Sequence, residues 1–86
     1  MAKLINEPVK VHGQEALSLK AFVWRRRFYR VREVINWWRQ PASWDRSETP
    51  LFLRVNATSG YTLAGSTGTY ELCRLGEEWF LHRVID

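Results

Sequence analysis

The chain has 86 residues, with thirteen Lys and Arg against nine Asp and Glu, which gives a net charge of +4. This length fits a single domain spanning residues 1–86, and five Trp, four Phe and three Tyr can give it a dense core. A single cysteine excludes an internal disulfide, and no apolar run approaches the ~20 residues of a membrane-spanning helix. The first residues also lack the apolar run of a signal peptide, so we expect a cytoplasmic protein with no membrane partner.

Alternation of apolar and polar residues recurs along the chain and predicts short strands. In chain order these are residues 9–12, 22–24, 27–39, 51–55, 70–73 and 79–82. Turn-like breaks separate them at residues 13–17, 25–26, 40–50 and 56–68, and the last break has room for a short extra strand at 61–64. The pattern predicts an all-β fold of five to seven strands with little or no helix. We expect a small antiparallel barrel or a strongly curved sheet.

The predicted strand 27–39 changes phase along its length. Tyr29 and Val31 occupy odd positions, whereas Val34 and Trp38 occupy even ones. A slip of one residue indicates a β-bulge near residues 33–34 or a short helical turn, and we favour the bulge because a small barrel needs bent strands.

The five tryptophans fall into three groups. Trp24, Trp38 and Trp79 are in phase with apolar neighbours and are predicted to lie in the core. Trp44 lies in a loop bracketed by two prolines, and it either plugs one end of the barrel or is exposed. Trp37 is the best candidate for a surface tryptophan.

Several short motifs occur in a fixed order: F-x-W, R-x-Y-x-V-x-E-V-x-x-x-W-R, F-x-R-V, G-x-Y-E-L-x-R and W-F-L-x-R-V-x-D. Together they resemble a family of small bacterial proteins, DUF6504, over about residues 22–86. The pattern is also similar to the C-terminal segment of the inactive Y-family polymerase-like subunit of the bacterial mutasome. The matching residues are Phe22, Trp24, Arg27, Tyr29, Val31, Glu33, Val34, Trp38, Arg39, Trp44, Phe52, Arg54, Val55, Gly68, Tyr70, Glu71, Leu72, Arg74, Trp79, Phe80, Leu81, Arg83, Val84 and Asp86.

This resemblance implies an accessory module of DNA damage tolerance that has no catalytic residues and contacts a polymerase-like protein. The chain departs from the family pattern at two positions. Arg25 and Arg26 form the turn in which the family usually has Gly, so this turn is either strained or of another type than I′. Trp37 stands where the family tends to carry a polar or basic residue, and the resemblance therefore implies that Trp37 is the tryptophan least suited to the core.

Arginine and tryptophan are concentrated between residues 24 and 46. Basic residues follow a phosphate backbone, and exposed aromatic rings stack on unpaired bases. The alternative is a solvated strand face whose arginine stems cover apolar surface. The candidates for binding nucleic acid or a partner are Arg25, Arg26, Arg27, Arg30, Arg32, Trp37, Arg39 and Trp44.

Residues 14–19, QEALSL, have the form of a peptide that docks on a bacterial sliding clamp, through Gln14, Leu17 and Leu19. Such short matches recur by chance, and the alternative is a loop that leads into the next strand.

Enzymatic chemistry has little support. Cys73 has no neighbouring His, and His12 and His82 lack the spacing of a metal site. Glu33 and Glu71 are strand carboxylates, and either of them can pair with an Arg across the sheet. We therefore expect a non-enzymatic binding module without metal or cofactor. It contacts a polymerase-like or other DNA-repair protein, binds single-stranded or duplex DNA directly, or associates with itself through an uncovered sheet edge. We expect a monomer or a weak dimer.

Overall fold

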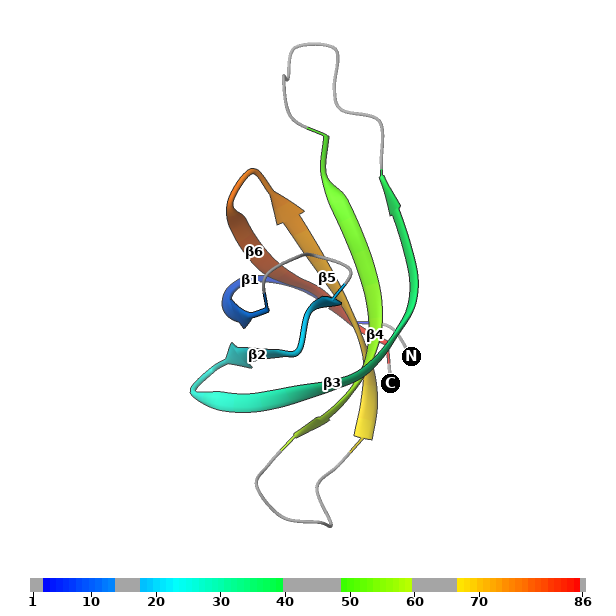
Figure 1. The fold of residues 1–86 in the computed structure, drawn as a ribbon. Coiled ribbons are helices and arrows are strands. Elements are labelled where there is room, and N and C mark those ends of the chain that lie inside the picture. The colour runs from blue at the N-terminus through cyan, green and yellow to red at the C-terminus, as the bar shows by residue number, and fades with distance from the viewer. Residues whose placement is uncertain (1–2, 14–17, 40–48, 60–66, 86) are drawn as a thin grey trace.

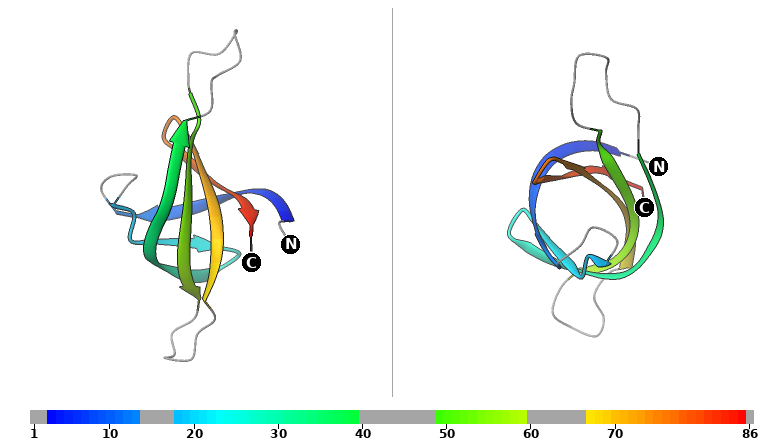
Figure 2. Two further views of the ribbon diagram at one scale, coloured as in Figure 1. Left: turned by 90° about the vertical axis from the view of Figure 1, so that its right-hand side faces the viewer. Right: turned by 45° about the horizontal axis from the view of Figure 1, so that its top comes forward.

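The computed structural model describes residues 3–13, 18–39, 49–59 and 67–85. Six antiparallel strands follow one another and close into a barrel, because the last strand pairs with the first (Figures 1 and 2). The prediction of a small all-β barrel is therefore confirmed, and the described residues contain no α-helix. The strands are β1 (Lys3–His12), β2 (Ala21–Trp24), β3 (Arg27–Arg39), β4 (Leu51–Ser59), β5 (Thr67–Leu75) and β6 (Glu78–Val84). The predicted short strand at 61–64 lies outside the described residues.

The predicted alternation sets the core. On β4, Leu53 and Val55 are fully buried, and they alternate with residues that face outward. Leu72 on β5 and Leu81 on β6 are paired neighbours and are also fully buried. The outward row is not all exposed, since Phe52 is only 7% exposed.

Three aromatic rings pack against one another in this core. The rings of Phe22 and Tyr29 are stacked, with centroids 4.9 Å apart. Tyr70 meets both of them edge-on, at 5.8 Å from Phe22 and 5.2 Å from Tyr29. Such edge contacts contribute beyond the area that the rings bury, and burial raises the pKa of the Tyr70 hydroxyl.

Strand β3 slips twice against β4. The pairing shifts between Val31 and Glu33, which confirms the predicted bulge, and it shifts again between Val34 and Asn36. A one-residue slip moves every following side chain to the other face. The second slip therefore puts Trp38 opposite Phe52 on the outer face.

The prediction that Trp38 lies in the core is therefore wrong. Its ring stacks on Phe52, with centroids 5.6 Å apart, and it is half-buried on the outside of the barrel. Trp37 is 49% exposed, as predicted for a surface tryptophan. Trp24 and Trp79 are partly buried and pack against the core, which agrees with their predicted placement.

Candidate nucleic-acid interface

The turn between β2 and β3 consists of Arg25 and Arg26, because Trp24 pairs with Arg27. Both arginines have positive φ, 52° and 64°. Positive φ at both central residues is the mark of a type I′ turn, which matches the twist of the flanking strands but is unfavourable for residues with a Cβ. Of the two alternatives that the sequence left open, the strained turn is the one found.

Glu7 on β1 holds this turn in place. Its Oε1 accepts hydrogen bonds from Trp24 Nε1 and Arg25 Nε, both at 2.9 Å. Its Oε2 pairs with an Arg25 terminal nitrogen at 2.6 Å, and the guanidinium also lies 4.7 Å from the Trp24 ring centroid. These bonds, first from Arg25 and then from Trp24, lower the pKa of Glu7 from 4.5 to about 2. Arg25 is thus committed to a partner within the barrel.

The outer surface of β1, β2 and β3 carries two rows of paired residues. Lys10, Val23 and Phe28 form one row. His12, Ala21 and Arg30 form the next, and the His12 and Phe28 rings lie 6.1 Å apart. Arg26 at the turn and Arg32 at the first bulge of β3 are also exposed. We call this surface the basic face, made up of Lys10, His12, Arg26, Phe28, Arg30 and Arg32.

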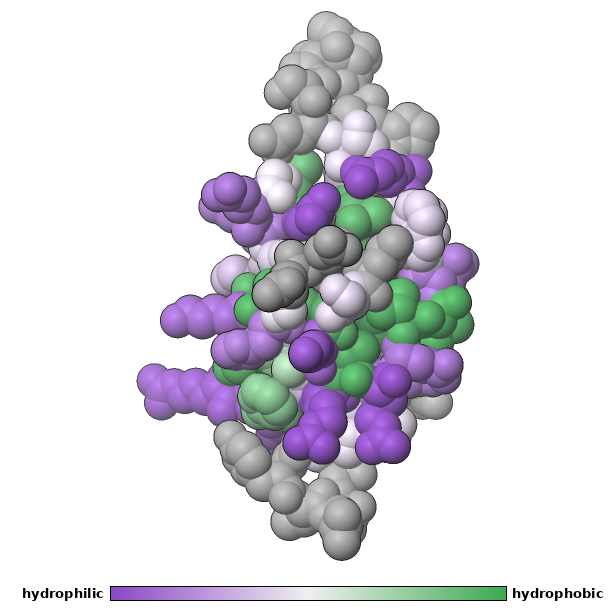
Figure 3. Space-filling model, viewed as in Figure 1, coloured by the Kyte–Doolittle hydropathy of each residue, from purple (hydrophilic) through white to green (hydrophobic). Residues whose placement is uncertain are grey.

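Within the described parts of β1 to β3, the cations of the basic face outnumber the carboxylates. These strands contain two described carboxylates, Glu7 and Glu33. Glu7 is held by Arg25, and Glu33 accepts a hydrogen bond from Asn56 of β4 at 3.1 Å. Among the described residues, no side-chain hydrogen bond or ion pair engages the guanidinium of Arg26 or of Arg30. Figure 3 shows the hydrophilic side chains projecting over the region of β2 and β3.

The arginines predicted to bind nucleic acid or a partner lie on different parts of the barrel. Arg26, Arg30 and Arg32 belong to the basic face, whereas Arg27 is exposed opposite Trp24 in the inner phase of the barrel. Arg39 is exposed at the far end of β3, near Trp37, opposite Leu51 of β4.

Trp44, Gln14 and Leu17 lie outside the described residues. Leu19 is 5% exposed and packs in the core, so its side chain is unavailable for docking on another protein while the barrel is folded.

Sequence reasoning missed three members of the basic face: Lys10, His12 and Phe28. The signal was present, because Lys10 and His12 have the outward phase in the alternation with Val9 and Val11. Their place beside the arginines depends on the pairing of β1 with β2, which no local pattern reveals.

A second outer cluster lies on β3, β4 and β6. The Phe52 ring stacks on Trp38 and makes a T-shaped contact with the His82 ring, with centroids 5.2 Å apart. Arg54 lies 5.7 Å from the Trp38 ring centroid and pairs with Glu71 at 3.6 Å, which confirms the predicted cross-strand pair for that carboxylate. Glu33, the other carboxylate considered for such a pair, instead accepts a hydrogen bond from Asn56. This cluster stabilises the wall of the barrel.

Cys73 is half-buried on β5, and burial, with a smaller effect of Glu71, raises the pKa of its thiol. A raised pKa disfavours the reactive thiolate. Within the described ranges, no three His, Cys, Asp or Glu side chains gather in a way that could hold a metal ion. No described helix has the length and apolar character needed to cross a bilayer.

No family model, curated protein or solved structure matches this chain. The resemblance to DUF6504 therefore stays a prediction.

Proposed function

We propose that this protein is a non-enzymatic accessory module that binds single-stranded nucleic acid on its basic face. The observation that carries the proposal is the set of exposed cations around Phe28, whose side chains form no ion pair with another described residue. Following the resemblance, we place this activity in bacterial DNA repair or translesion synthesis, in the cytoplasm.

The arrangement suits a flexible strand that crosses β1, β2 and β3. Lys10, Arg26 and Arg30 offer positive charge to successive phosphates, and arginine can engage a phosphate through two parallel hydrogen bonds. Phe28 and His12 lie between these cations with their rings 6.1 Å apart. Base–aromatic stacking contributes about 1–3 kcal/mol per base. Stacking needs an unpaired base, so the geometry favours a single strand over a duplex.

The test is an NMR amide-shift titration of the labelled domain with a short single-stranded DNA and with the matching duplex. Each is measured at low and at physiological salt. We expect shifts at Lys10, Phe28 and Arg30 that are larger for the single strand and weaken as salt rises. Equal shifts with the duplex would overturn the preference for single strands. If no amide signal shifts even at low salt, the protein does not bind nucleic acid and the basic face is a solvated surface.

A second candidate function, contact with a polymerase-like protein, is supported by exposed apolar side chains on β3. Ile35 is 48% and Trp37 49% exposed. Apolar anchors of this kind recur at the centres of protein interfaces. Binding through them should survive high salt, and Trp37→Ala should weaken it without affecting DNA binding. Mixing the labelled domain with the mutasome polymerase-like subunit tests this candidate.

The self-associating alternative depended on an uncovered sheet edge. Because β1 pairs with β6, the described sheet has no free terminal strand. This removes the structural argument for that alternative, and sedimentation at high concentration tests it directly.

A further inference from the structure

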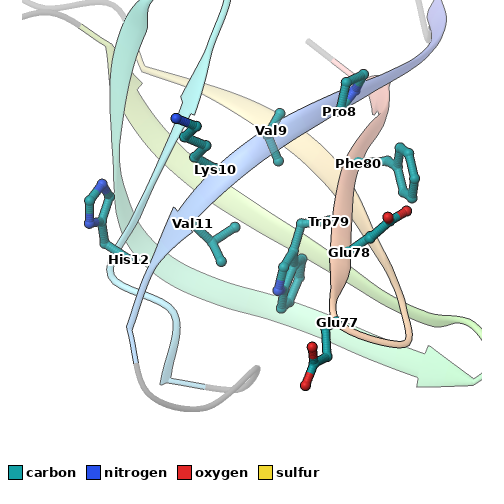
Figure 4. Close-up of a pocket in the computed structure, with 9 residues that line it drawn as sticks. All are labelled: Pro8, Val9, Lys10, Val11, His12, Glu77, Glu78, Trp79 and Phe80. Carbon is teal, nitrogen blue, oxygen red and sulfur yellow. The ribbon is translucent and has the colours of Figure 1, made fainter.

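A cavity of about 610 Å³ opens between β1 and the start of β6. It arises because β1 pairs with β6 only as far as Val9, opposite Trp79, and then continues alongside β2. Figure 4 shows Val11 and Trp79 projecting toward one another into this space. The volume is within the ~300–1,000 Å³ typical of small-molecule sites.

The walls of this cavity differ in character. Val9, Val11 and Trp79 form an apolar floor that packs against the core. Arg74 on β5 lies 6.0 Å from the centroid of the Trp79 ring and helps to fix the ring.

The two rims of the cavity carry opposite charges. Lys10 and His12 line the rim on β1, and Glu77 and Glu78 line the rim at the turn before β6. Glu77 is two positions from Trp79 in the chain, and both residues line the cavity. The cavity therefore suits a flat ligand with hydrogen-bond donors at one edge and a negative charge at the other.

We propose that this cavity takes an unpaired guanine base of a bound strand. Guanine carries two adjacent donors, N1–H and N2–H, on its Watson–Crick edge, and these match the two oxygens of a carboxylate such as Glu77. Adenine and cytosine present one amino donor beside a ring acceptor, which a carboxylate repels. The flat purine stacks on Trp79, as bases do on aromatic side chains in single-strand binding proteins.

The phosphate of the same nucleotide is placed by Lys10 and His12, which belong to both the cavity rim and the basic face. A strand on the basic face can therefore turn one base into the cavity without leaving the cations. This inference rests on the proposed function. It adds recognition of one base to a surface that otherwise binds any single strand through its phosphates and through base stacking.

The experiment follows the indole N–H signal of Trp79, assigned from the spectrum of Trp79→Phe, during titrations with the 5′-monophosphates of guanosine, adenosine, cytidine and uridine. We expect guanosine monophosphate to shift this signal and to bind at least about fivefold more tightly than the others. Glu77→Gln should reduce the preference to less than about twofold. Glu33→Gln, which makes the same charge change on β3, should leave it intact. Equal binding of all four nucleotides, or an unmoved Trp79 signal, would overturn the inference.

Oligonucleotides separate this inference from the proposed function. An oligo-dT strand and the same strand with one central dG are titrated side by side. If both shift Phe28 and Arg30 equally and neither shifts Trp79, the strand-binding proposal stands and the guanine site falls. If guanosine monophosphate shifts Trp79 but neither strand shifts the basic face, strand binding falls and the cavity is a site for a free guanine nucleotide. A tighter complex with the dG strand that depends on Glu77 supports both.

Discussion

The carboxylate of Glu7 holds the guanidinium of Arg25 through two hydrogen bonds, although the two residues are 18 positions apart in the sequence. The same carboxylate accepts the indole N–H of Trp24, so one side chain on β1 fixes both the end of β2 and the turn that follows it. The strained turn thereby has a partner outside the hairpin. The basic face begins at the next residue, Arg26.

Acid should release this contact. The pKa of Glu7 is lowered from 4.5 to about 2 in the folded protein, so its stabilising effect is complete above about pH 4.5. That effect is lost as the pH falls from about 4.5 toward 2. Thermal unfolding midpoints measured from pH 2 to pH 7 should show Glu7→Gln less stable than wild type at neutral pH. The two proteins should converge near pH 2.

Glu33→Gln is the control, because it removes a carboxylate that has no such arginine pair. Its difference from wild type should change less with pH. A difference between Glu7→Gln and wild type that is the same at pH 2 and pH 7 would contradict the assignment.

The turn itself can be relieved of strain. Arg26 has φ of 64°, which glycine adopts freely and other residues do not. Arg26→Gly and Arg26→Ala remove the same charge, but only glycine removes the clash of the Cβ. We expect the glycine variant to be about 1 kcal/mol more stable than the alanine variant in urea unfolding. Equal stabilities would show that the turn is not strained.

The two neighbouring tryptophans should respond differently to truncation. Trp37 is half-exposed, so Trp37→Ala should change the free energy of unfolding by no more than about 0.5 kcal/mol. Trp38 stacks on Phe52 and lies under Arg54, so Trp38→Ala should cost about 1–2 kcal/mol. Chemical denaturation of both variants measures the two losses in free energy of unfolding. A larger loss for Trp37→Ala than for Trp38→Ala would contradict the second bulge of β3.

Salt dependence should identify the side chains of the basic face that neutralise phosphates. Arg30→Glu should weaken binding of a single strand and reduce the slope of log K against log salt by about 0.7 for each phosphate that the variant no longer neutralises. The combined Arg26→Glu and Arg30→Glu variant should abolish binding. The same charge reversal at Arg83, exposed on β6, should have little effect. If the double variant binds as well as wild type, the site lies elsewhere.

The sequence predicted the strands because their alternation is a local property. The sequence alone shows which residues of a strand share a face. On β4, Leu53 and Val55 alternate with Arg54, and on β5, Leu72 alternates with Glu71. Local reasoning failed at β3, where the pattern of Val34 and Trp38 was consistent with a single slip. The second slip becomes visible only when Trp37 is matched with Leu53 across the strand pair.

The sites were predicted less completely than the fold, for the same reason. The arginines of the basic face are close together in the sequence, so the local excess of arginine was enough to identify them as candidates. The partners that define their roles come from other strands: Glu7 engages Arg25, and His12 lies beside Phe28. The proposed guanine cavity brings together β1 and β6 at opposite ends of the chain, and no motif spans that separation.

The closure of the barrel determines when the strands can pair during synthesis. Lys3 pairs with Val84, so the wall is complete only when strands from opposite ends of the sequence meet. During synthesis, β1 leaves the ribosome before the other strands and waits for β6, the last of the six. Pairings between distant parts of a chain are slow to form, typically on the scale of milliseconds to seconds in small β-proteins. Until β6 pairs with β1, the apolar side chains of β1 stay exposed to solvent. The nascent chain is therefore most prone to aggregation just before β6 emerges.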